Sequence, residues 1–170
     1  KVTSDIVISA LRGSSYTNTQ SQIIMGAGRQ QTFIVNYSTT AKVLYIQQHN
    51  LIIKDLCVKQ DLSTTPTAGA GIYVGITSAT FDINKCMYYF QLENVDIEGC
   101  YDDLRCENNM GNWYNRLRLY KPVRYGLHYN SGIPTGGNWY NAIQIHHPTA
   151  GNTATGIYVA QGDTTRMTHS

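Results

Sequence analysis

Two carboxylates stand two residues apart in the stretch NVDIEG, and this spacing could support acid/base chemistry. Side chains alternate between the faces of a β-strand, so an inward Val95 and Ile97 would place Asp96 and Glu98 together on the outer face. Their backbone positions would lie roughly 6.6 Å apart, because each residue rises about 3.3 Å. Flexible tips could then reach the separation used by inverting or by retaining glycosidases. The pair therefore permits a hydrolytic site without selecting its stereochemical outcome.

Neighbouring segments supply partners for this pair if apolar pairs that recur along the chain are stacked in register. We name the resulting set the central stripe: Cys57, Lys59, Asp96, Glu98, Arg118, Tyr120, Gln144 and His146. We predict a catalytic group within it, formed by Asp96, Glu98 and Arg118. The remaining ionic, amide and aromatic side chains are predicted to bind substrate, namely Lys59, Tyr120, Gln144 and His146. A carboxyl group whose pKa is raised by its neighbour would act as the general acid.

Three other interpretations of the central stripe stay open, of which the first is contact with a sugar without any chemistry. In a lyase, the cationic groups would neutralise a uronate, and Lys59, Tyr120 or His146 would remove the proton. Alternatively, Asp96 with Arg118 and Glu98 with Lys59 are ordinary exposed ion pairs, each contributing roughly 0 to 1 kcal/mol. The residue types alone do not choose among these interpretations.

A second outer stripe combines aromatic and cationic side chains, and we predict that it contacts a sugar: Tyr73, Arg105, His128 and Tyr158. Tyrosines on strands also pack against their neighbours, which is the alternative. Trp113 and Trp139 occupy equivalent points of a repeated motif. We expect both to pack at a corner of the fold, with sugar binding as the alternative.

The residues that could bind a metal show no ligand spacing. Cys57, Cys86, Cys100 and Cys106 form no CxxC motif, so free thiols are expected, although a bridge between Cys57 and Cys100 stays open. Free thiols favour assembly in a reducing cytoplasm. The sequence DD at 102–103 lacks a calcium-loop pattern and is expected to form an exposed turn. We therefore predict no metal and no cofactor.

Composition excludes some partners. The net charge is +2 and only 14% of residues are charged, without the clustered Lys and Arg that nucleic acid requires. No run of 18 apolar residues exists that would span a membrane. Polarity comes from Asn, Gln, Ser, Thr and Gly, and aromaticity from 13 Tyr. These groups suit neutral or mildly charged sugars, and equally they suit strands and turns.

The elements that position these stripes are short strands, because apolar and polar residues alternate and turn residues interrupt them every 8 to 12 residues. We predict strands at 6–8, 23–25, 33–35, 43–46, 51–58, 72–76, 89–97, 104–106, 117–119, 127–129, 143–145 and 157–159. The motif GNWYN occurs at 111–115 and again at 137–141. Repetition at this period is typical of stacked architectures, in which each turn buries its apolar side against the next.

Two interleaved series of apolar pairs support this stacking. The first is Leu56/Val58, Val95/Ile97, Leu117/Leu119 and Ile143/Ile145. The second is Ile72/Val74, Leu104/Cys106, Leu127/Tyr129 and Ile157/Val159. Gly71, Gly126 and Gly156 precede the second series, where we expect sharp bends, and Asn94, Asn115 and Asn141 precede the first, where we expect a stacked ladder. The predicted fold is an all-β solenoid with several short strands per coil.

Some of these stretches resemble a known family. SQIIMGAGRQQTFIVN followed by NLIIKDLCVK is similar to the opening coils of the pectate-lyase-like right-handed parallel β-helix, and GNWYNAIQI with TATGIYVA resembles coil repeats of bacteriophage tailspikes in that superfamily. The resemblance covers residues 5–160 and implies a homotrimeric virion protein that binds or cuts a bacterial surface polysaccharide. Neither end shows a readable cap, so we expect residues 1–170 to be one β-helix domain from a longer chain.

Three functions follow as hypotheses. The first is a tailspike or tail-fibre β-helix that binds, and in one version depolymerises, a surface glycan while attached to other virion tail proteins. The second is a structural shaft or adhesin without catalysis. The third is a secreted microbial polysaccharide lyase. The corresponding location is the virion tail, assembled in the host cytoplasm, or the extracellular space.

Overall fold

A computed structural model describes residues 3–9, 21–61, 63–75, 87–129, 137–146, 154–159 and 166–168, the last segment by its backbone only. Every regular element in these ranges is a β-strand. The strands are β1 (Ile6–Ser9), β2 (Gln22–Met25), β3 (Phe33–Asn36), β4 (Lys42–Gln47), β5 (Leu51–Gln60), β6 (Ala70–Val74), β7 (Met87–Tyr88), β8 (Gln91–Glu98), β9 (Asp102–Cys106), β10 (Asn109–Met110), β11 (Trp113–Tyr120), β12 (Tyr125–Tyr129), β13 (Trp139–His146), β14 (Thr155–Val159) and β15 (Arg166–Thr168).

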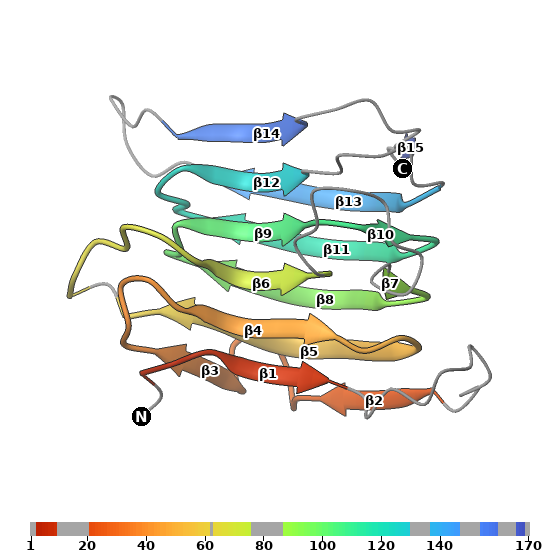
Figure 1. The fold of residues 1–170 in the computed structure, drawn as a ribbon, viewed down its shortest axis with the longest axis horizontal. Helices are drawn as coiled ribbons and strands as arrows, with labels where there is room; N and C mark the ends of the chain where they lie inside the picture. The colour runs from red at the N-terminus through yellow and green to blue at the C-terminus, as the bar shows by residue number, and fades with distance from the viewer. Residues whose placement is uncertain are drawn as a thin grey trace.

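The strands form two large sheets between which the chain alternates. Sheet 1 has the order β1-β4-β6-β9-β12-β14, and sheet 2 has the order β15-β13-β11-β8-β5-β2, with β3 also paired to β5. A small third sheet pairs β7 with β10. In Figure 1 the strands of sheet 1 rise in chain order from β1 at the bottom to β14 at the top. All pairs between these strands are parallel, so the antiparallel sandwich that short strands also allow is excluded.

The predicted first series is confirmed by the pairing within sheet 2. Leu56 pairs with Val95, and Leu117 pairs with Ile143 on the next strand. Val95 and Leu117 are buried, and the partly buried Ile143 packs against the same cluster. These side chains therefore form one interior column across successive strands.

The second series is confirmed in sheet 1. Leu104 pairs with Ile72 on one side and with Leu127 on the other, and Leu127 pairs in turn with Ile157. Side chains from both sheets meet in one apolar cluster, in which Ile72 and Val95 are completely buried. Full burial of a side chain of this size contributes about 1.5 to 3 kcal/mol, so the interior between the sheets holds them together.

A column of left-handed residues crosses the long strands of sheet 2. Asp55, Asn94, Arg116 and Ala142 occupy equivalent register positions, and their φ angles are 57°, 54°, 52° and 51°. Each residue bends its strand and shifts the alternation of side chains beyond it. Asn94, a member of the predicted asparagine ladder, lies at this bend, and its Nδ2 donates to Asp55 Oδ1 at 2.6 Å.

The predicted glycine bends have a different explanation. Gly71 and Gly126 lack the positive φ that a left-handed bend would give. A Cβ atom at Gly71 would lie 2.3 Å from Ile97 Cγ2, and one at Gly126 would lie 2.7 Å from Ile145 Cγ2. These glycines are therefore required because side chains of sheet 2 approach the backbone of sheet 1 closely. Gly156 precedes Ile157 in β14 without a positive φ.

Candidate functional site

The repeated motif GNWYN forms equivalent corners on adjacent strands. Gly111 and Gly137 adopt φ angles of 67° and 51°, the left-handed region that glycine tolerates. Asn112 follows Gly111 and its Oδ1 accepts a hydrogen bond from the Phe90 amide at 2.8 Å. Asn138 does the same one turn later, accepting from the Asn112 amide at 3.1 Å. Both asparagines are fully buried, so they satisfy backbone donors that water does not reach.

The aromatic residues of the motif stack on their counterparts. The Trp113 and Trp139 rings have centroids 5.0 Å apart and planes inclined by 9°. Tyr114 and Tyr140 stack similarly at 4.7 Å, but inside the core. Alternation along the strand explains the difference, since neighbouring residues face opposite sides. Both tryptophans remain 38% exposed, and Tyr89 extends their stack at 6.4 Å.

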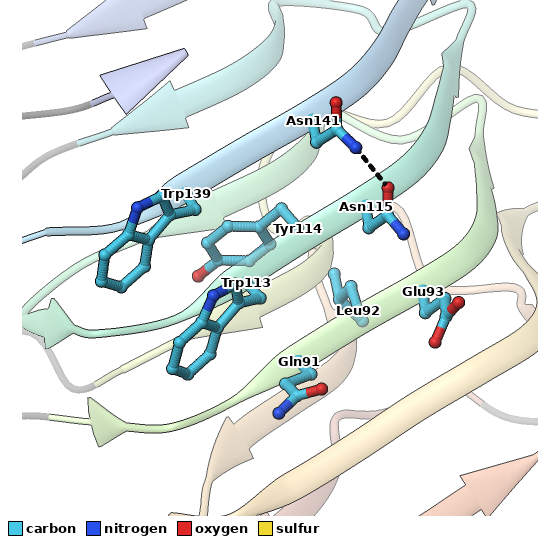
Figure 2. Close-up of a pocket in the computed structure, with 8 residues that line it drawn as sticks. All are labelled: Gln91, Leu92, Glu93, Trp113, Tyr114, Asn115, Trp139 and Asn141. Atoms are coloured by element: carbon cyan, nitrogen blue, oxygen red, sulfur yellow. Dashed lines mark hydrogen bonds between the residues drawn. The ribbon is translucent and has the colours of Figure 1, made fainter. Parts of the chain in front are cut away.

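These tryptophans form one wall of a groove of about 360 Å³. One column of lining residues consists of Gln91, Trp113 and Trp139, and the other, two residues further along each strand, consists of Glu93, Asn115 and Asn141. Figure 2 shows the two indoles and the Gln91 amide on one side, and the Asn115 and Asn141 amides and the Glu93 carboxylate on the other. The buried side chains of Leu92 and Tyr114 point into the core, so their backbone forms the floor.

The polar wall contains the asparagine ladder that the sequence predicts. Asn141 Nδ2 donates to Asn115 Oδ1 at 3.0 Å, which confirms two of the three members. The third, Asn94, lies at the bend one position further along. Glu93 accepts from Arg116 Nη2 at 2.7 Å. Both partners of this ion pair are well exposed, so it contributes about 0 to 1 kcal/mol.

The lining of this groove offers hydrogen-bonding amides, one carboxylate and aromatic surface. Its lining includes no serine, cysteine or histidine, and Glu93 is its single ionisable acid. Indole N–H groups and amide groups donate hydrogen bonds, and amide oxygens accept them. Aromatic surface beside a few polar groups is typical of ligand pockets. The sequence predicts corner packing for the tryptophans, with sugar binding as the alternative, and a structural ladder for Asn115 and Asn141. It does not predict that the two columns line one groove, although the repeated motif contains members of both.

The register of the central stripe agrees with the predicted alignment. Asp96 pairs with Cys57 and with Arg118, and Glu98 pairs with Lys59 and with Tyr120. Gln144 and His146 follow on β13, beside Arg118 and Tyr120 respectively. The Tyr120 and His146 rings lie 5.7 Å apart. The structure thus brings the predicted catalytic and substrate-binding residues of this stripe together.

The environment of Asp96 favours a structural role. Its side chain is only 2% exposed, and its carboxylate pairs with Arg118 and, at 3.3 Å, with Arg29 Nη1. Arg29 comes from the connection between β2 and β3, and no periodic signal in the sequence links it to Asp96. Burial, followed by the charges of Asp96 and Glu98, raises the pKa of the adjacent Cys57 thiol to about 11. That thiol is therefore protonated and unreactive at neutral pH.

The second stripe is also aligned as predicted, and the polar groups of Tyr73, Arg105 and His128 are paired within the protein. Tyr73, Arg105, His128 and Tyr158 are consecutive partners across sheet 1. Tyr73 Oη donates to Glu107, and Arg105 Nε donates to Glu107 Oε1 at 2.8 Å. The His128 ring packs against the Tyr158 ring with centroids 5.3 Å apart. Packing between neighbours, the alternative for this stripe, is therefore observed.

A buried ion-pair network below this stripe was not predicted. Asp102 is completely buried, lies 2.8 Å from His128 Nδ1 and accepts from Arg124 Nε at 2.8 Å. Burial alone would raise the pKa of Asp102, but the hydrogen bonds from His128 and Arg124 outweigh it and lower that pKa. Asp103 is buried too, and its Oδ1 accepts from the Cys100 amide at 3.2 Å. The predicted exposed turn at 102–103 is wrong, because both residues belong to β9.

Cys57, Cys100 and Cys106 are buried free thiols, so the bridge between Cys57 and Cys100 is not formed, and Cys86 lies outside the described residues. The described part of the chain holds no group of three His, Cys, Asp or Glu side chains placed to bind a metal ion. No helix among the described residues could span a membrane. A comparison with protein-family models, curated proteins and solved structures found no match to this chain.

Proposed function

We propose that the chain is a right-handed parallel β-helix that binds a bacterial surface polysaccharide in the groove between Trp113 and Asn115. Parallel strands that alternate between two sheets, each paired to the strand one turn earlier, support the solenoid. Crossover connections between parallel strands are right-handed in about 98% of cases, which supports the handedness. The resemblance of the coil repeats to bacteriophage tailspikes supports a virion tail location, a homotrimer and attachment to other tail proteins.

One observation carries the binding function. The two half-exposed tryptophans and the amide column line the same groove on three adjacent strands, β8, β11 and β13. Aromatic surface buries the apolar faces and edges of a sugar, while amides exchange hydrogen bonds with its hydroxyl groups. A structural shaft needs no such exposed indoles, since exposed large aromatic side chains mark recognition surfaces.

Binding without cleavage is the version that the charged residues favour. The predicted catalytic carboxylate Asp96 is enclosed by two guanidinium groups and has little contact with solvent. Such a buried carboxylate needs its cationic partners to compensate its charge, so these ion pairs would have to break before it could exchange protons with a sugar. If Asp96 cannot take part in the reaction, Glu98 has no second carboxylate of the predicted pair to work with, and glycosidases require two.

The test is a binding assay on immobilised, purified lipopolysaccharides and capsular polysaccharides. We expect binding to at least one of them, and a loss of about tenfold or more in affinity for Trp113→Ala and for Trp139→Ala. Trp113→Tyr should retain part of the affinity, and Tyr37→Ala is the matched control, because Tyr37 is exposed to a similar extent outside the groove. Binding that does not depend on either tryptophan would remove the groove as the site.

The same samples test cleavage. We expect no oligosaccharide to be released from the bound polysaccharide. Release by the wild-type chain that disappears in the double variant Asp96→Asn, Glu98→Gln would restore the depolymerase hypothesis, whereas unchanged release would exclude these carboxylates. Calcium-dependent formation of unsaturated uronides would favour the lyase.

A further inference from the structure

The groove has a direction that constrains its ligand. Trp113 pairs with Gln91 below and with Trp139 above, and Asn115 pairs with Glu93 and with Asn141 in the same way. Both walls therefore run across the strands, along the axis on which the strands are stacked. Successive strands lie about 4.8 Å apart. Each strand therefore contributes one side chain to each wall of the groove at every ~4.8 Å along it. A linear ligand in this groove would meet the same pair of walls at every step (Figure 2).

The charge of the groove is the second constraint. Glu93 is the single charged residue of the lining. The nearest guanidinium, that of Arg116, is already paired with Glu93 at 2.7 Å. Lys54 aligns with Glu93 one strand below, outside the lining. A ligand carboxylate or phosphate placed between the walls would therefore lie near the Glu93 carboxylate, and no cationic residue of the lining would compensate its charge. Like charges in contact oppose binding.

The hydrogen-bonding capacity of the groove is the third constraint. Asn115 Oδ1 accepts from Asn141, while Asn115 Nδ2 makes no hydrogen bond to any described residue. The amide of Gln91 likewise has no partner in the described part of the chain. Unpaired amide donors and acceptors beside indole rings match hydroxyl and acetamido groups, which are uncharged.

On the basis of the proposed function, we infer that the groove selects an uncharged linear glycan that lies across β8, β11 and β13, with one sugar unit against each strand. Neutral polar groups and aromatic surface supply the contacts, so affinity does not depend on ionic attraction. Three strands line the groove, so a fragment of three sugar units fills it.

The experiment measures affinity for neutral surface polysaccharides and for acidic ones that contain uronate, sialate or phosphate. Each is tested as the intact polymer and as fragments of increasing length, in NaCl from ~0.01 M to ~1 M. We expect tryptophan-dependent binding to a neutral polymer, a change of less than about threefold across the salt series, and no gain in affinity beyond trisaccharide fragments.

A charge-reversal variant tests the role of Glu93. Glu93→Lys should raise affinity for an acidic polymer about tenfold or more, because it replaces a like charge by an opposite one. Far-UV circular dichroism and the melting temperature of each variant establish that it is folded. No gain for the folded variant would contradict the role assigned to Glu93.

The outcomes separate this inference from the function on which it rests. One outcome is that an acidic polymer binds, that its affinity falls tenfold with salt, and that Trp113→Ala abolishes the binding. In that case the prediction of a neutral glycan is wrong, and the groove remains the binding site. Affinity that continues to rise well beyond trisaccharide length would contradict the placement along three strands. If Trp113→Ala and Trp139→Ala leave all polysaccharide binding unchanged, both the proposed function and this inference fail.

Discussion

Asn112 and Asn138 show how a single residue type stabilises the stacking. Each side chain accepts a hydrogen bond from the main chain one turn below, at a position that is completely buried. Asn138 also donates to the Asn109 carbonyl at 3.3 Å and to Tyr129 Oη at 3.1 Å. Without these side chains, the amides at the corner would be buried without partners, which costs more than losing an exposed hydrogen bond.

Asn138→Ala should lower the free energy of unfolding by about 2 kcal/mol, since it leaves the Asn112 amide and the Asn109 carbonyl short of a partner. Urea denaturation followed by circular dichroism measures the change. Asn115→Ala is the matched control, because its hydrogen bond lies on the groove surface, and a cost of about 0.5 kcal/mol or less is expected. Equal costs for the two variants would contradict the role of the buried corner.

Asp103 predicts how stability depends on pH. Burial raises the pKa of its carboxyl well above the ordinary value of 3.8, so the folded chain binds a proton that the unfolded chain releases. The free energy of unfolding should therefore fall as pH rises from 3.8 towards the raised pKa, by at most about 1.4 kcal/mol per pH unit. The pKa of Asp102 is lowered, so its contribution is lost only as pH falls below 3.8.

Denaturant titrations between ~pH 4 and ~pH 8 test this dependence, with Asp103→Asn as the variant that lacks the titrating group. The slope of stability against pH should be smaller in the variant than in the wild-type chain. A slope that is the same in both would show that other groups control the pH dependence.

At the scale of elements, the bends in sheet 2 explain both the success and the limits of prediction from sequence. Every predicted strand overlaps an observed one, because alternation within four or five residues is a local property. The predicted strand 117–119 is too short, because the left-handed Arg116 shifts the alternation between Tyr114 and Leu117. The predicted strand 89–97 begins at Gln91 instead, because Tyr89 is left-handed.

Other features were not predictable because they arise only after folding. β7 and β10 have two residues each, which is too short for a pattern. Arg29 pairs with Asp96 from a connection 67 residues earlier in the chain, and no pattern in the sequence around Arg29 indicates this contact. The stripes were predictable because register follows from the apolar series, whereas burial of Asp96 depends on that connection.

Ala142 offers a test of the column of left-handed residues that crosses sheet 2. It adopts a left-handed conformation without being glycine, asparagine or aspartate, a conformation that costs an L-residue roughly 1 to 2 kcal/mol. Ala142→Gly should therefore raise the free energy of unfolding by up to about 1 kcal/mol, the gain being reduced by the greater freedom of glycine in the unfolded chain. Thermal denaturation measures the shift. A loss of stability would contradict strain at this bend.

At the scale of the whole molecule, contacts join each strand mainly to the strands next to it in its own sheet. Val95 pairs with Leu56 on one neighbouring strand, whereas Ile143 lies two strands beyond Val95 in sheet 2. If the chain is the solenoid proposed above, its stability is approximately a sum of terms for each repeat and each interface between adjacent repeats. This differs from a compact core, in which a buried residue touches partners from distant parts of the chain.

Double-mutant cycles should reveal this difference. Leu56→Ala and Val95→Ala should show a coupling energy of at least about 0.5 kcal/mol, because the two side chains are partners across adjacent strands. Leu56→Ala and Ile143→Ala, three strands apart in the order of sheet 2, should be additive within about 0.5 kcal/mol. Comparable coupling in both cycles would show that interactions in the interior are not confined to adjacent strands.

The stacked indoles also make the chain its own optical reporter. The chain has two tryptophans, and both stand in the wall of the groove with their planes inclined by only 9°. All indole fluorescence therefore originates there, and a molecule entering the groove would change emission or quenching without any attached dye. Occupancy could be followed by titration in a cuvette, with the signal arising at the site of contact.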